Sequence, residues 1–196
     1  MRSQAAALPQ TARASARSSD HYSSSGIWIG VFAITMSFAA FTSALFVREG
    51  TADWGHLVLP PILYANTIVL LASSGTLELA RRSLREEEGT SKASRLVLLT
   101  LLLGLAFCTG QYRAWLDLRT QGIYLATNPN SSFFYVLTFL HALHVLAGIL
   151  VLVYLAGRLA ASQKAFRPSL FRSTAIYWHF MAVLWVYLFM LCRMKL

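Results

Sequence analysis

Acidic residues are scarce in this chain of 196 residues, which has 8 Asp and Glu against 17 Lys and Arg. None of the 8 lies in the middle of an apolar run, which excludes a carboxylate-rich metal site or a carboxylate proton relay inside a membrane. Glu78 comes nearest, at the end of such a run. The others are Asp20, Glu49, Asp53, Glu86, Glu87, Glu88 and Asp117.

Cysteine is also rare, since the chain has only Cys108 and Cys192, both in apolar sequence and far apart. We interpret them as small buried hydrophobic residues. The sequence has no CxxC pair, no glycine-rich phosphate loop and no nucleophile beside a base. The chain by itself therefore shows no active site, and the pattern favours an accessory subunit over an enzyme or a transporter.

Hydrophobic sequence is abundant, with 56% hydrophobic and 13% charged residues, which is typical of a membrane protein. Roughly 20 apolar residues cross the hydrocarbon core, and five runs reach about that length. We predict an all-α integral membrane protein with one domain, residues 27–196. Its five spans cover about residues 27–47, 57–79, 96–115, 133–157 and 174–193.

Turn residues mark two of the expected helix starts. Pro60 and Pro61 suit the first turn of the second span, because the amide hydrogen that proline lacks would have no partner there. The Asn-Pro-Asn turn at 128–130 or Ser131 suits the cap of the fourth span.

The net charge of +9 reports topology and not a nucleic-acid partner, because the basic residues lie in short segments between the spans. Twelve Lys and Arg lie in the N-terminal segment and in loops 78–95 and 158–173, against five on the opposite side. The positive-inside rule then places the N-terminus in the cytoplasm and the C-terminus outside, on the periplasmic face of a bacterial cytoplasmic (inner) membrane.

Residues 1–26 are rich in Ser, Ala and Arg, with one acid. This composition is typical of a transit peptide or of a flexible cytoplasmic arm. We favour the arm, because five strongly apolar spans are awkward cargo for import into an organelle.

His141 and His144 lie three residues apart within the fourth span, about one helical turn apart. This spacing is too short for stacked haems, which need histidines about four turns apart on each helix. A metal site needs a third ligand, for which His179 is the only other histidine within a span. We therefore expect the histidines to hydrogen-bond to neighbouring helices or to water, with His179 as the first candidate neighbour of the pair.

Glu78 is followed at three and four residues by Arg81 and Arg82, a spacing that permits a local ion pair at the cytoplasmic interface. The alternative is a bridge to a partner chain or to a lipid headgroup. Asn66 in the second span also needs a partner, because an amide buried in lipid is costly.

Three motifs resemble subunit III of the haem-copper terminal oxidases. LPPILYANTIVLLASSGTLELARR is similar to that family's Asn-Thr and Ser-Ser segment, which ends in a basic pair. SFFYVLTFLHALHVLAGI is similar to its His-x-Leu-His-Val signature, and YWHFMAVLWVYLF, which contains Trp178, to its Tyr-Trp-His-Phe ending. AAFTSALFVREG resembles the corresponding first helix of short bacterial members.

The resemblance implies a five-helix form of a V-shaped bundle whose cleft holds phospholipid. It implies direct docking on the catalytic subunit I, in a complex with subunit II and small subunits. This chain would hold no cofactor, while haem and copper would lie in the partner subunits. Its expected work is to stabilise subunit I and to support proton uptake during aerobic respiration. Glu78, Arg81, Arg82, Asn66, His141, His144, Trp178 and His179 are the motif, lipid or interface candidates.

The chain departs from the family at two acids. The family often has a glutamate in the first of these spans, near Ile34, and an aspartate at the position of Ala182. Roles of those acids do not carry over.

Two alternatives remain open on the sequence. One is a homologous accessory protein of a nitric oxide reductase, and the other is an independent membrane protein that binds haem or metal through its histidines. The sequence also leaves cytochrome c and quinol open as the electron donor, because the donor binds elsewhere in the complex.

Overall fold

The structure is a computed structural model that describes residues 10–49, 54, 58–84, 89–160 and 168–195. It contains five helices, and no strand occurs in these ranges. The helices are α1 (Gln10–Arg48), α2 (Ile62–Ser83), α3 (Gly89–Thr120), α4 (Pro129–Ala160) and α5 (Pro168–Lys195).

All five helices are long and apolar enough to cross a membrane, which confirms the predicted fold class. Four of them, α1, α3, α4 and α5, extend beyond both ends of the spans that hydropathy predicts. The third helix begins at Gly89 and the fourth at Pro129, because helical hydrogen bonding continues beyond the apolar segment. The second begins at Ile62, directly after the proline pair.

The first helix begins at Gln10, well before the expected end of the N-terminal arm at residue 26. The sequence from Gln10 to Ser25 has no proline or glycine, so nothing in it interrupts a helix that propagates from the span. Residues 1–9 of the arm lie outside the described part of the chain. The cytoplasmic location of the arm stays a prediction.

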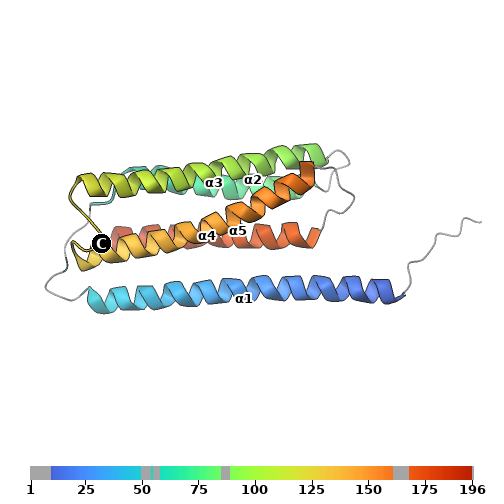
Figure 1. Ribbon diagram of the computed structural model, residues 1–196, viewed down its shortest axis with the longest axis horizontal. Helices are drawn as coiled ribbons and strands as arrows, with labels where there is room; N and C mark the ends of the chain where they lie inside the picture. Colours follow the sequence, from blue (N-terminus) through green and yellow to red (C-terminus); the bar gives the residue numbers. More distant parts are fainter. Residues whose placement is uncertain (1–9, 50–53, 55–57, 85–88, 161–167, 196) are drawn as a thin grey trace, which may run out of the picture.

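Figure 1 shows α4 and α5 in the middle of the bundle, with α2 and α3 on one side and α1 on the other. The helix contacts agree, because α1 packs on α4 and α5 while α2 packs on α3 and α5. Only 17% of the apolar window of α1 is buried, against 50% for α5. The α5 helix is thus central, and α1 presents most of its surface outward.

The ends of the hairpin between α3 and α4 follow local rules. Gly122 has φ +76°, and the backbone N–H of Ile123 donates to the Leu118 carbonyl over 3.0 Å, the glycine stop signal of a helix. The α4 helix then begins at Pro129, and the Ser131 hydroxyl accepts a hydrogen bond of 3.1 Å from the Asn128 N–H. The predicted capping by Ser131 is confirmed.

Candidate functional site

The site begins with hydrogen bonds that join α5 to α2. The Trp178 indole N–H donates to the Ser73 hydroxyl over 3.0 Å, and the Trp185 indole N–H donates to the Thr67 hydroxyl over 3.0 Å. Both indoles come from the same face of α5, because seven residues are about two turns. Each bond gives a buried polar group a partner on another helix, which helices in lipid need.

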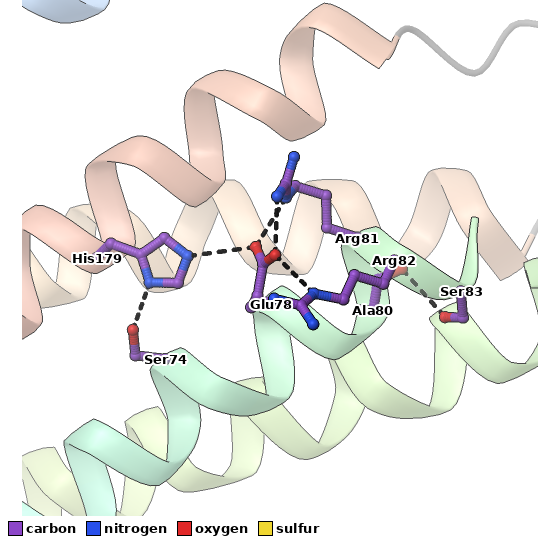
Figure 2. Close-up of polar contacts among 7 residues, drawn as sticks. All are labelled: Ser74, Glu78, Ala80, Arg81, Arg82, Ser83 and His179. Atoms are coloured by element: carbon purple, nitrogen blue, oxygen red, sulfur yellow. Dashed lines mark hydrogen bonds and ion pairs between the residues drawn. The ribbon is translucent and has the colours of Figure 1, made fainter. Parts of the chain in front are cut away.

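His179 adds a third hydrogen bond between α5 and α2. Its Nδ1 is hydrogen-bonded to the Ser74 hydroxyl, and its Nε2 points toward a Glu78 oxygen 3.8 Å away (Figure 2). A separation of 3.8 Å is too long for a hydrogen bond. We call the pairs Ser73–Trp178, Ser74–His179 and Thr67–Trp185 the α2–α5 ladder.

Glu78 is the centre of a charged cluster at the end of this ladder, as Figure 2 shows. Arg81 binds both carboxylate oxygens, with its Nε and Nη2 each 2.7 Å from one of them, and Arg82 Nε donates over 3.0 Å. The predicted local ion pair is confirmed. The side chain of Glu78 is 23% exposed and that of Arg82 is 72% exposed, so the cluster lies at the surface of the bundle and not in its core.

The chemistry of the cluster is that of a structural clamp. Hydroxyl, imidazole and carboxylate follow one another through Ser74, His179 and Glu78, an order that hydrolases use. Here the carboxylate is held by two guanidinium groups and makes no hydrogen bond to the imidazole. The carboxylate therefore does not orient His179 as a base, and the imidazole serves to tie α5 to α2.

Trp178 occupies a slot between α3 and α4. A Cβ atom built on Gly104 would lie 3.0 Å from the Trp178 ring, and one built on Gly148 would also lie 3.0 Å from it. Glycine at both positions lets the two helices approach the fully buried indole from opposite sides. Trp178 thus contacts three helices from its position on α5.

Asn66 finds its partner on α3 and not on α5. Its amide nitrogen donates to the Phe107 carbonyl over 3.4 Å. A Cβ atom on Gly110 would lie 2.0 Å from the Asn66 carbonyl oxygen, so Gly110 leaves the room that this amide occupies. Asn66 therefore joins α2 to α3.

His141 lies apart from the charged cluster. Its ring is fully buried, 5.8 Å from the Phe107 ring in an edge contact and 5.1 Å from the Trp185 ring. Neither ring nitrogen has a hydrogen-bond partner within the described part of the chain. The predicted hydrogen bond to a neighbouring helix is absent for this histidine among those residues.

His144 faces a different direction. Its Nδ1 is hydrogen-bonded to the Leu140 carbonyl of its own helix over 2.7 Å, and its ring meets the edge of Phe38 on α1. The expectation that His179 is the neighbour of the histidine pair was wrong. His179 lies on the face of α5 toward α2, where its Nδ1 is hydrogen-bonded to Ser74.

The histidines do not converge on one point, and among the described residues no group of three His, Cys, Asp or Glu side chains is placed to hold a metal ion.

Sequence reasoning missed the hydroxyl side of the ladder. Ser73, Ser74 and Thr67 read as residues that need no partner outside their helix, yet each pairs with an aromatic side chain of α5. A usable signal was present, because Trp178 and Trp185 are seven residues apart and their partners Ser73 and Thr67 are six apart, each spacing being about two helical turns.

Comparison with known proteins gives one consistent answer. Residues 25–194 match the family described as cytochrome c oxidase subunit III. The cytochrome c oxidase subunit 3 of Synechocystis sp. is 30% identical over 169 residues, which cover 85% of this chain and 69% of that protein. That of Corynebacterium diphtheriae is 31% identical over 79% of this chain and 78% of its own length. A probable cytochrome c oxidase subunit 3 of Mycobacterium leprae is 33% identical over 63% of this chain and 61% of its length.

Proposed function

The chain belongs to the cytochrome c oxidase subunit III family, and from this premise we propose that it is the accessory, cofactor-free subunit of a respiratory haem-copper oxidase in a bacterial cytoplasmic membrane. The observation that carries the proposal is the extent of the family match, which runs through all five helices that can cross a membrane. A cytochrome oxidase subunit works in a complex with other subunits. We take the direct partner to be the catalytic subunit I, which with subunit II would hold the haem and copper.

The contacts within the chain favour a scaffolding role. Several of its interior polar side chains join one helix to another, as Trp178 and His179 join α5 to α2. No carboxylate lies in the middle of a span. The chain thus has the interior of a supporting bundle, and its role would be to stabilise subunit I.

A groove between α1 and α4 favours bound phospholipid. It has a volume of about 1040 Å³ and small side chains of α1, such as Ala40 and Ala44, along one wall. Phe133 forms part of the opposite wall together with the polar residues Thr127, Asn128 and Ser132, and Arg48 also lines the groove. An apolar wall beside a cation suits an acyl chain with an anionic headgroup. We place the lipid of the proposed function in this groove.

The charged cluster of Glu78, Arg81 and Arg82 favours a role at the cytoplasmic side. With the N-terminus in the cytoplasm, the end of α2 that carries the cluster faces the cytoplasm. Charged groups there would support proton uptake by the complex.

Affinity capture tests the proposed partner. We expect the full chain, tagged at its N-terminus and extracted in a mild detergent, to bring down subunits I and II of a haem-copper oxidase, while the untagged chain brings down neither. Mass spectrometry of the eluate identifies them. Recovery of a nitric oxide reductase catalytic subunit instead would overturn the oxidase assignment. A Soret band that stays with the isolated chain would overturn its cofactor-free status.

Cysteine labelling tests the topology on one helix. We expect a membrane-impermeant maleimide to label Thr120→Cys on intact spheroplasts and to label Ser91→Cys only after permeabilisation, because α3 would run outward from the cytoplasm. Both positions are exposed, and the background carries Cys108→Ala and Cys192→Ala. The reverse pattern contradicts the proposed orientation.

A further inference from the structure

Among the described residues, two polar side chains inside the bundle have no hydrogen-bond partner. His141 is 0% exposed and Gln111 is 1% exposed. Both ring nitrogens of His141 and both amide atoms of Gln111 lack a hydrogen bond to any described residue. Such groups are rare in folded proteins, because a buried polar atom without a hydrogen bond destabilises the fold. The pair therefore indicates a ligand that supplies hydrogen bonds.

The helix register brings the two side chains to one place. Gln111 lies one turn after Phe107 and one turn before Trp115 on the same face of α3. The Phe107 ring meets His141, and the Trp115 indole N–H donates to the Thr138 hydroxyl over 3.1 Å. Since Thr138 is one turn before His141 on α4, Gln111 lies on the α3–α4 seam at the level between them.

Two polar groups near this level, the Trp185 indole and the Thr138 hydroxyl, already make hydrogen bonds to other residues. The Trp185 indole beside His141 donates to Thr67 on α2. The Thr138 hydroxyl accepts from Trp115 and donates to the Phe134 carbonyl over 2.7 Å. These groups are bonded to other residues, so a small polar ligand is the natural partner of His141 and Gln111.

We propose that the α3–α4 seam is a binding site for internal water, with the imidazole of His141 and the amide of Gln111 as its ligands. Together the two side chains offer four polar atoms, and because the two nitrogens of one imidazole point in different directions, at least two waters are needed to bond to all four. A metal ion fits poorly, because zinc takes three or four protein ligands and the carboxamide is a weak one. Water between the two side chains bridges α3 to α4, as Asn66 bridges α2 to α3 and the ladder bridges α2 to α5.

Solid-state NMR of the full chain in phospholipid bilayers tests the site. With ¹⁵N-labelled histidine and tryptophan, polarisation is transferred from water to the ring nitrogens, and His141→Phe assigns the His141 signal. The His141 nitrogens should gain signal several-fold faster than the Trp178 indole nitrogen, which is equally buried but bonded to Ser73. Equal, slow transfer to both would overturn the proposal, and so would a direct bond between His141 and Gln111 detected as a scalar coupling.

A variant tests whether Gln111 shares the water. Gln111→Leu should slow water transfer to His141 several-fold, because two of the four polar atoms of the site are removed. Gln111→Met, which keeps the side-chain length, serves if the leucine variant does not fold. Thr109→Val is the matched control, since Thr109 is exposed on α3 and bonds only to the Leu105 carbonyl of its own helix. Unchanged transfer to His141 in the folded Gln111 variant would overturn the shared site.

Discussion

Trp178→Ala should destabilise the folded chain more than any other single replacement of an aromatic side chain. The indole is fully buried, fills the slot between Gly104 and Gly148, and donates to Ser73. Large-to-small replacement of a buried tryptophan costs about 3–5 kcal/mol in unfolding free energy. The lower end of that range is expected here, because lipid already solvates apolar atoms and only packing and the hydrogen bond are lost.

Titration of the reconstituted chain with a denaturing detergent measures this loss. Trp28→Ala is the matched control, because Trp28 lies on α1 with 58% of its surface exposed. Ser73→Ala isolates the hydrogen bond and should cost about 1 kcal/mol. If Trp178→Ala cost no more than Trp28→Ala, the central position assigned to Trp178 would be wrong.

The fold was predictable because hydropathy and length decide whether a helix crosses a membrane. Five uncharged runs predicted five helices, and the structure has them. The start of α1 at Gln10 was not predictable in the same way, because the residues before the span are polar and hydropathy says nothing about a polar helix. Some helix ends follow local sequence signals and could be predicted from them. The hydrogen bond from the Asn128 N–H to the Ser131 hydroxyl at the start of α4 is an example.

Contacts in the candidate site were predictable only where both residues lie on the same helix. Glu78 pairs with Arg81 as expected, because spacing along one helix fixes that contact. The bond between His179 and Ser74 depends on how far α5 slides and rotates against α2, which the sequence of neither helix states alone. His141 and His144 illustrate the same limit, since one helix turn separates a ring that faces α3 and α5 from one that faces α1.

The two positions at which the resemblance leads one to expect an acid carry apolar side chains in this chain. Ala182 is 2% exposed within the core, and Ile34 is partly buried against it. A buried carboxylate at either place would need a partner. This protein would therefore do its proposed work without a carboxylate at these positions. Glu78, in the charged cluster, is the only acidic residue of α2.

Deletion of this chain from the assembled oxidase should leave the haem spectrum largely intact while turnover fails several-fold sooner. The proposed haem and copper ligands belong to the partner subunits, so their absorbance does not depend on this chain. The apolar window of α1 is only 17% buried within the chain, which leaves a broad surface for lipid or a partner. Loss of the chain would expose the matching partner surface and open the complex to inactivation during turnover.

Oxygen consumption followed over many turnovers, beside the reduced-minus-oxidised haem spectrum, separates these effects. Adding back the native chain should restore the lifetime of the enzyme. Trp178→Ala should restore it poorly, because the bundle that packs around the indole is weakened. If haem absorbance vanished with the chain, the chain would be required for haem assembly or ligation, and the role as a cofactor-free support would be wrong. Undiminished durability without the chain would equally contradict the stabilising role.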